Sequence, residues 1–244
     1  MKKEYHSWHS PTLGVTMPIV IYGHWGYPIL MFPTAAADCE EYERFGLLDA
    51  IAHHIETGRV RLFSIDSINK YSWMNDGVQP AERAYRQAMY DVYVASEVAP
   101  FIRNACQSGD ISIGTTGASF GAYHALNSLL KHPDVFRLTL AMSGAYDIKN
   151  YTNGWYDENV YFNNPVDYLP NLNEGSTLET LRHCNINIMT GQGAYEAPHQ
   201  SRRMSEILSA KGISHNLDLW GYEWPHDWPT WKVMLDQYIG RLFY

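Results

Sequence analysis

The pentapeptide Gly117-Ala118-Ser119-Phe120-Gly121 is the segment of this sequence whose residue types and spacing most clearly suggest chemistry. The apolar residues before it, 111–115, indicate a strand, and residues 122–131 after it indicate a helix. A strand, a sharp turn and a helix form the setting of a G-x-S-x-G nucleophile elbow, in which small residues permit a strained turn that exposes the serine hydroxyl. Ser119 is therefore predicted to be a nucleophile.

A serine hydroxyl is a weak nucleophile at its ordinary pKa, so Ser119 needs a general base. Eleven histidines compete for this role. His226 is the favoured one, because it follows the predicted strand 213–220 and precedes the last predicted helix. In proteins with a nucleophile elbow, the chain order is serine, acid, histidine, and the histidine lies in a loop at this place.

The acid that orients the histidine should follow a strand between Ser119 and His226. Glu196 meets this requirement, because it lies in the loop after the predicted strand 186–189 and ahead of an amphipathic helix. Asp147, after the predicted strand 135–142, and Glu223, in the His226 loop, are the alternatives. The true acid is expected to be buried and hydrogen-bonded, since its negative charge must hold the tautomer of the histidine.

An oxyanion hole is also expected beside Ser119. One donor should be the backbone N–H of Phe120, and the other should come from the loop after the predicted strand 29–32. The small residues of this loop let the backbone approach a ligand, which makes Thr34 or Ala35 the second donor. Such donors stabilise the charge of the tetrahedral intermediate by about 3 kcal/mol each.

Alternating strands and helices must position these residues. Apolar runs at 17–22, 29–32, 60–65, 111–113, 135–142 and 186–189 predict strands, and several are apolar on both faces, as strands covered by helices on two sides must be. The turn residues between 22 and 29 suggest that the first two strands are adjacent. The alternating pattern at 213–220 predicts a half-exposed strand near the sheet edge. Long helices are predicted at 80–106, 200–212 and 229–242. The alternation of strands and helices predicts an α/β fold with a mostly parallel sheet.

Residues 145–174 fit neither the helix nor the strand period and are rich in aromatic residues and Asn. An irregular segment of this length is often a lid or a binding loop. Four of the eight Trp lie close to His226 in the sequence: Trp220, Trp224, Trp228 and Trp231. With 18 Tyr and 8 Phe in addition, the aromatic residues are predicted to form part of an active-site wall suited to an acyl or aromatic group with a polar end.

Length and charge restrict the remaining possibilities. A chain of 244 residues with 45% hydrophobic residues is expected to form a single domain over residues 1–244. The net charge of −8, without a basic cluster, argues against nucleic acid. We expect no membrane span and no signal peptide, because apolar runs are short and the first ten residues lack an apolar core. Three scattered cysteines fit a reducing cytoplasm, and exposed aromatic residues would make a homo-oligomer unsurprising.

The sequence contains no motif typical of metal or nucleotide binding. The sequence has no HExxH and no Walker A motif, and Gly191-Gln192-Gly193 lacks the third glycine of a dinucleotide site. His53 and His54 are adjacent, which places them about 100° apart on a helix, so we do not expect them to converge on one metal. We therefore expect neither a metal site nor a nucleotide site.

Several segments together resemble a known family. Phe32-Pro33-Thr34, the elbow, Ser143-Gly144-Ala145-Tyr146-Asp147, Leu219-Trp220-Gly221 and His226-Asp227-Trp228 are similar to those of the putative esterase family of α/β-hydrolases. This family includes S-formylglutathione hydrolase (esterase D) and the mycolyltransferases. The resemblance implies an α/β-hydrolase fold, with Ser119 as nucleophile and His226 as base, and the hydrolysis or transfer of acyl groups without a cofactor.

The sequence thus predicts a serine esterase that acts on a small-molecule carboxylic ester through an acyl-enzyme on Ser119. An acyltransferase with the same triad is one alternative. The other is a binding protein that has kept the fold without the activity, since fold does not determine function.

Overall fold

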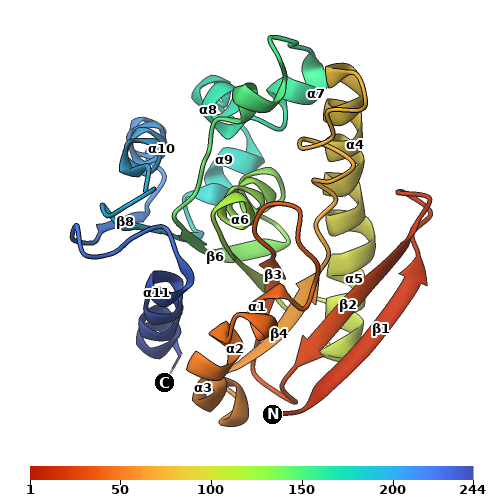
Figure 1. Ribbon diagram of the computed structural model, residues 1–244, viewed down its shortest axis with the longest axis vertical. Helices are drawn as coiled ribbons and strands as arrows, with labels where there is room; N and C mark the ends of the chain where they lie inside the picture. Colours follow the sequence, from red (N-terminus) through yellow and green to blue (C-terminus); the bar gives the residue numbers. More distant parts are fainter. Residues whose placement is uncertain (244) are drawn as a thin grey trace.

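A computed structural model describes residues 1–243 and shows a central sheet with helices on both faces (Figure 1). The strands follow the spatial order β1-β2-β4-β3-β5-β6-β7-β8. Their bounds are Lys3–His9 (β1), Thr16–Tyr22 (β2), Tyr27–Phe32 (β3), Val60–Ile65 (β4), Ile113–Ala118 (β5), Phe136–Met142 (β6), Asn185–Thr190 (β7) and Asn216–Leu219 (β8). Strands β3 to β8 run parallel, whereas β2 is antiparallel to both β1 and β4. The α/β-hydrolase fold predicted from the sequence is confirmed.

Two hydrophobic cores lie on opposite faces of the sheet, and alternate residues of each central strand enter them. In β2, Ile19 and Ile21 belong to one core, and Val20 and Tyr22 to the other. This division follows from the period of two along a strand. Strands that are buried on both faces explain the continuous apolar runs in the sequence.

The helices divide between the two cores. One core is covered by α1 (Glu41–Arg44), α2 (Leu47–Ala50), α3 (Ala52–Glu56) and α11 (Trp228–Leu242). The other is covered by α4 (Pro80–Tyr93), the π-helix η1 (Val94–Val98), α5 (Ala99–Ala105), α6 (Phe120–Lys131), α8 (Pro165–Tyr168), the 3₁₀ helix η3 (Leu169–Asn171), α9 (Ser176–Leu181) and α10 (Pro198–Ala210). Within residues 1–243, no helix combines the length and apolar character needed to cross a bilayer.

The segment predicted as a lid, 145–174, contains short helices rather than extended irregular chain. It holds η2 (Ile148–Tyr151), α7 (Glu158–Tyr161), α8 and η3. Ile148 and Val160 pack with Phe120, Tyr123 and Trp73 in a third apolar cluster. The segment therefore rests on the start of α6 and on α4, as Figure 1 shows for α7.

The prediction that strands 17–22 and 29–32 are adjacent is wrong, because β4 lies between them. Gly26 permits this arrangement. Its φ is +115°, and a Cβ there would lie 2.6 Å from the Val60 N, so the chain crosses the start of β4 at close range before β3 begins. The predicted strand 111–113 is also shifted, since β5 runs from Ile113 to Ala118 and leads directly into the elbow.

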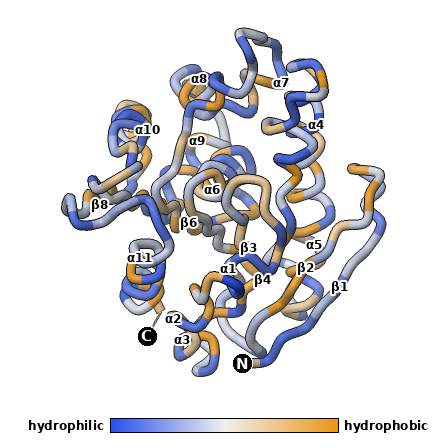
Figure 2. The backbone as a smooth tube through the Cα atoms, in the orientation of Figure 1, coloured by the Kyte–Doolittle hydropathy of each residue, from blue (hydrophilic) through white to orange (hydrophobic). Residues whose placement is uncertain are grey.

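Strand β1 was not predicted from the sequence, because its residues are polar and mostly exposed. In Figure 2 the tube of β1 is largely hydrophilic, whereas β2 beside it is largely hydrophobic. At the opposite edge, β8 is short and half-buried, in agreement with the predicted edge strand.

Candidate active site

Ser119 lies in a sharp turn between β5 and α6, with φ +56° and ψ −120°. Two glycines make this turn possible. A Cβ on Gly117 would lie 2.3 Å from the Gly121 carbonyl carbon, and one on Gly121 would lie 2.3 Å from the Phe32 oxygen. The contact of Gly121 with Phe32 also brings the end of β3, and hence the loop after it, against the turn. The geometry is that of a nucleophile elbow.

His226 lies with its Nε2 2.9 Å from Ser119 Oγ. It belongs to the loop between β8 and α11, as expected from the chain order. Its backbone N–H donates to the Ala194 oxygen at 2.9 Å, which fixes this loop against the loop after β7. The close approach of the two loops depends on Gly191, where a Cβ would lie 2.0 Å from the Trp224 oxygen.

Glu196 lies on the other side of the imidazole, with Oε2 3.3 Å from His226 Nδ1. Its side chain is only 1% exposed. The carboxylate also accepts hydrogen bonds from Ser143 Oγ (2.5 Å), Thr190 Oγ1 (3.1 Å) and the Gly191 N–H (3.3 Å). Because a carboxylate acceptor faces Nδ1, that nitrogen carries the hydrogen, and the lone pair of Nε2 faces Ser119.

The surroundings of Glu196 keep it ionised at neutral pH. Burial alone raises the pKa of a carboxyl group, but the hydrogen bonds from His226 and Ser143 outweigh this effect. The pKa of Glu196 therefore lies below its ordinary value. The group combines burial with a stable negative charge, as expected for the residue that orients the histidine.

The two alternative acids lie elsewhere. Asp147 caps η2, where it accepts a hydrogen bond from Arg203 Nη1 at 2.8 Å and others from the Lys149 N–H and Asn164 Nδ2. Glu223 is exposed, and its carboxylate folds back over Gly221. Within the described chain, His226 is hydrogen-bonded to neither of them.

The backbone donors of the predicted oxyanion hole come from two elements. Phe120 is the first residue of α6, where a helix leaves its N–H groups without partners in the helix. The Thr34 N–H, by contrast, donates to Glu41 Oε2 at 2.8 Å. Ala35 has φ +34°, and its N–H has no hydrogen-bond acceptor in residues 1–243. Of the two alternatives for the second donor, Ala35 is the one whose N–H is available.

Several residues at this site were not assigned a role beside the triad from the sequence. Ser143 follows β6, and Thr190 ends β7, so both stand at the same carboxyl edge of the sheet as Ser119. Trp231 donates from Nε1 to Ser143 Oγ at 3.0 Å, and its ring lies 5.1 Å from that of His226. Position at the carboxyl end of a neighbouring strand is the sequence property that could have indicated Thr190, whereas Ser143 also begins one of the segments that resemble the family.

The aromatic residues predicted to surround His226 only partly do so. Trp231 packs on His226, and Trp228 packs on Trp231 and stacks on Phe45. Trp220 and Trp224 pack on each other. Within 145–174, Tyr151 contacts the Phe120 ring. Trp155, Tyr156 and Phe162 are about half exposed, whereas Tyr195 and Tyr222, in the two loops that meet at His226, are 93% and 80% exposed.

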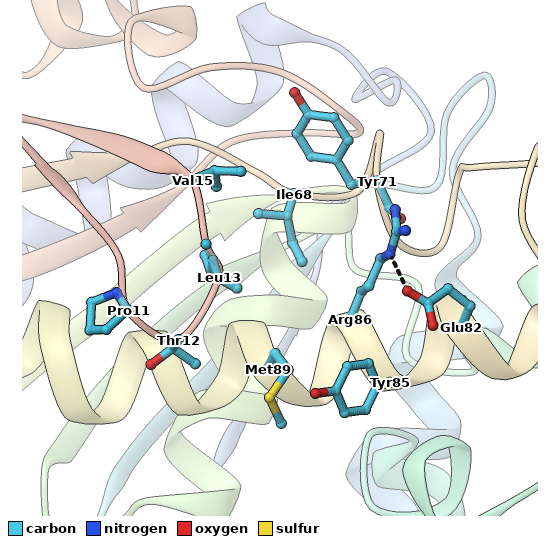
Figure 3. Close-up of a pocket in the computed structure, with 11 residues that line it drawn as sticks. Pro11, Thr12, Leu13, Val15, Ile68, Tyr71, Glu82, Tyr85, Arg86 and Met89 are labelled. Atoms are coloured by element: carbon cyan, nitrogen blue, oxygen red, sulfur yellow. Dashed lines mark hydrogen bonds and ion pairs between the residues drawn. The ribbon is translucent and has the colours of Figure 1, made fainter.

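A sizeable cavity lies away from the predicted triad. It has a volume of about 540 Å³ and lies between the β1–β2 turn and α4, lined by Leu13, Ile68, Tyr85 and Met89 among others (Figure 3). Its polar wall includes the ion pair between Arg86 and Glu82, 2.7 Å long. No residue of the predicted triad or oxyanion hole lines it.

The expectation that His53 and His54 diverge is wrong. Both Nε2 atoms face Asp236 Oδ1, at 3.7 and 3.1 Å, because side chains of adjacent helical residues can bend toward the same partner on α11. Arg59 Nη1 lies 3.1 Å from His54 Nδ1. Since arginine can only donate, Nδ1 accepts and Nε2 carries the hydrogen that faces Asp236. In this arrangement His54 Nε2 directs a hydrogen toward the space between His53, His54 and Asp236, and not the lone pair that a metal ligand needs.

Comparisons with known structures find the same fold. A ferulic acid esterase superposes with a TM-score of 0.76 at 15% identity, over 100% of this chain and 98% of that chain. S-Formylglutathione hydrolase from Agrobacterium tumefaciens gives 0.74 at 14% identity, over 98% and 93%. MPT51 of Mycobacterium tuberculosis gives 0.76 at 15% identity, over 99% and 98%. At these identities the similarity concerns the fold.

The family comparison concerns the sequence itself. No curated protein matches this sequence. The model of the family described as "Putative esterase" matches residues 43–242, which include the elbow, the Glu196 loop and His226. The chain therefore belongs to the putative esterase family of carboxylic ester hydrolases.

Proposed function

We propose that this protein is a serine esterase that hydrolyses a carboxylic ester through an acyl-enzyme on Ser119. The observation that carries the proposal is the aligned series Ser119 Oγ, His226 and Glu196, with contacts of 2.9 and 3.3 Å. A nucleophile within hydrogen-bond reach of a base, itself oriented by a third group, is the arrangement that activates a serine hydroxyl.

In the acylation half, Ser119 Oγ attacks the carbonyl carbon of the ester while His226 Nε2 takes the hydroxyl proton. The carbonyl electron pair moves to the oxygen, whose negative charge faces the N–H groups of Phe120 and Ala35. Collapse of this intermediate breaks the bond to the alcohol oxygen, which receives the proton from His226. The alcohol leaves, and the acyl group remains on Ser119.

In the deacylation half, a water molecule replaces the alcohol. His226 takes a proton from the water as its oxygen attacks the acyl carbon, and the second tetrahedral intermediate uses the same two N–H groups. Collapse breaks the bond to Ser119 Oγ, which receives the proton from His226. The balance is one ester and one water consumed, with one acid and one alcohol released.

The aromatic side chains near the site suggest an ester with an aromatic or extended apolar part. Tyr195 and Tyr222 expose large ring surfaces on the two loops that meet at His226. Rings of this kind can pack on an apolar group while the hydroxyl contacts water. The names of the similar structures, a ferulic acid esterase and an S-formylglutathione hydrolase, refer to an aromatic acyl group and to a formyl group.

The proposal is tested with p-nitrophenyl acetate and the variant Ser119→Ala. Removal of the nucleophile should lower kcat by a factor of at least about 10⁴, with an unchanged thermal unfolding midpoint. A fluorophosphonate probe should label the wild-type protein and not the variant. Ser96→Ala is a matched control, because Ser96 Oγ lies on the exposed side of η1, where it donates only to the Val92 oxygen.

Turnover by Ser119→Ala at the wild-type rate would overturn the proposal. A wild-type protein that neither turns over esters nor reacts with the probe would favour a binding protein on the same fold. Product analysis with added alcohols distinguishes hydrolysis from acyl transfer, because a transferase would form the new ester in preference to the free acid.

A further inference from the structure

Ala35 adopts a backbone conformation that alanine seldom adopts, and its neighbours hold it there. Its φ is +34°. The Ala35 carbonyl accepts two hydrogen bonds, from Asn69 Nδ2 at 2.6 Å and from Ser67 Oγ at 3.1 Å. A non-glycine residue at positive φ persists where its surroundings determine it, and such residues are frequent at functional sites.

Asn69 is in turn oriented by His124. His124 Nε2 lies 3.0 Å from Asn69 Oδ1, and both residues are buried, at 3% and 0% exposure. Because the amide NH₂ group is directed to Ala35, its oxygen faces the imidazole, so Nε2 must carry the hydrogen and donate it. Burial among aromatic rings lowers the pKa of His124 to about 3, and the ring is neutral at working pH.

These hydrogen bonds join three separate elements at the carboxyl edge of the sheet. His124 belongs to α6, the helix whose first residue is Phe120. Asn69 belongs to the segment after β4, and Ala35 to the loop after β3. The series His124, Asn69, Ala35 therefore links the two backbone groups that are proposed to form the oxyanion hole.

The peptide group that carries the Ala35 N–H is held from both sides. On one side, Thr34 donates its N–H and its hydroxyl to the buried Glu41 carboxylate, at 2.8 and 2.6 Å. On the other side, Asn69 and Ser67 hold the Ala35 carbonyl. The carbonyl oxygen of this same peptide, that of Thr34, accepts the Ala37 N–H at 3.1 Å. Rotation of the peptide between residues 34 and 35 would break this bond, and the flanking groups hold its two ends in place, so the direction of the Ala35 N–H is set.

We infer that Asn69 and His124 are positioning residues that hold the Ala35 N–H as the second oxyanion donor. This inference rests on the proposed function. An oxyanion donor acts on the charge that develops in the transition state, so a displaced donor lowers kcat and leaves KM almost unchanged.

The first test replaces Asn69 by Asp, which keeps the shape of the side chain and removes the NH₂ donor to Ala35. We expect kcat for p-nitrophenyl acetate to fall by about 10- to 100-fold, with KM within about threefold of wild type. Affinity for phenylboronic acid, whose tetrahedral adduct on Ser119 places an oxygen between the two N–H groups, should fall with kcat. Ser67→Ala removes only the longer hydrogen bond and should give a smaller loss in the same direction.

The second test asks whether the donor on His124 matters. His124→Gln keeps an N–H that can reach Asn69 Oδ1, whereas His124→Leu removes it. The Gln variant should retain most of the kcat that the Leu variant loses. Equal kcat values in the two variants would show that His124 acts only by filling space.

Asn187→Asp is the matched control, because Asn187 is buried on β7 and hydrogen-bonds to Thr139 and Asn185, remote from the Ala35 loop. It reports the cost of a buried Asn→Asp change and should keep the wild-type kcat. If Ser119→Ala abolishes hydrolysis while Asn69→Asp and Ser67→Ala keep wild-type kcat, only this inference is overturned. If Ser119→Ala is active, the proposed function itself fails.

Discussion

At the scale of single residues, Ser143 and Trp231 extend the predicted triad into the interior of the protein. Trp231 Nε1 donates to Ser143 Oγ, and Ser143 Oγ donates to Glu196 Oε1. Ser143 itself has φ +53°, and its N–H donates to the Met189 oxygen at 2.7 Å. The orientation of the Glu196 carboxylate is therefore determined by groups beyond the three residues of the triad.

Glu196→Gln should lower kcat for p-nitrophenyl acetate by about 10²- to 10⁴-fold, because an amide stabilises neither the tautomer nor the charge of His226 as a carboxylate does. The change should also affect stability. Since the pKa of Glu196 is lower in the folded protein than its ordinary value of 4.5, its ionised form stabilises the fold above that pH, and this contribution disappears as the pH falls through the lowered pKa.

The difference in unfolding midpoint between wild type and Glu196→Gln should therefore be largest at neutral pH and shrink in acid, as measured by calorimetry at several pH values. Asp147→Asn and Glu223→Gln serve as controls and should keep kcat within about threefold, since the His226 ring is hydrogen-bonded to Ser119 and Glu196 and to neither of these residues. If one of them lost more activity than Glu196→Gln, the assignment of the acid would be incorrect.

The residues that could be predicted from the sequence are those with a local pattern. Ser119 lies in a pentapeptide motif, and His226 and Glu196 follow predicted strands in the expected chain order. Thr34 and Ala35 could not be separated, because the choice depends on Glu41, whose side chain takes the Thr34 N–H only after α1 folds back. Asn69 and His124 are likewise brought to Ala35 by tertiary structure alone.

At the scale of elements, the long helix predicted at 80–106 contains a π-helical turn, η1, between α4 and α5. Such turns insert a residue and change which side chains face a neighbouring element. Here Glu97 lies in the π turn and meets the end of β1 and the chain after it. It accepts hydrogen bonds from Trp8 Nε1 (2.7 Å), Ser10 Oγ (2.8 Å) and the Thr12 N–H (3.2 Å).

Glu97→Ala should destabilise the protein by about 2 kcal/mol, because three donors lose a charged acceptor in a partly buried site. Burial raises the pKa of Glu97, but the three hydrogen bonds lower it by a larger amount. The pKa therefore lies below its ordinary value. The stabilisation is present above pH 4.5 and is lost in acid. Urea unfolding at pH 7 and pH 3.5 measures both effects.

Glu82→Ala, which breaks only the exposed pair with Arg86 on α4, should cost less than about 1 kcal/mol. Equal losses for the two variants would contradict this account.

The order of the strands shows what the pattern of elements does not determine. The apolar runs predicted most of the strands, because burial on both faces leaves a continuous signal. Their neighbours depend on the path of the connections, and the prediction for residues 17–32 was wrong because β4 pairs with β2 and β3 at once. The polar sequence of β1 gives no apolar pattern that would predict a strand, because β1 is held in the sheet by its backbone pairing with β2.

At the scale of the whole molecule, the two sheet edges differ from the centre. Strand β1 carries Lys3, Glu4 and His6, and most of its residues are exposed. Lys3 pairs with Glu40 and with Glu43 on α1. Charged side chains on an edge strand discourage pairing with the sheet of another molecule. Strand β2, the next strand in the sheet, is apolar from Met17 to Tyr22 and buried there apart from Pro18.

A chain that lacks residues 1–9 should therefore self-associate, although its candidate active site is complete. Without β1, the buried strand β2 becomes an edge with free N–H and C=O groups and apolar side chains, which is a template for intermolecular pairing. Light scattering should show large assemblies for this chain at concentrations where the full chain scatters weakly. A chain that lacks only Met1 and Lys2 is the control, because the register of β1 begins at Lys3, and it should behave like the full chain. If the chain without β1 remained as disperse and as heat-stable as the full chain, the protection of the sheet would have to come from another element.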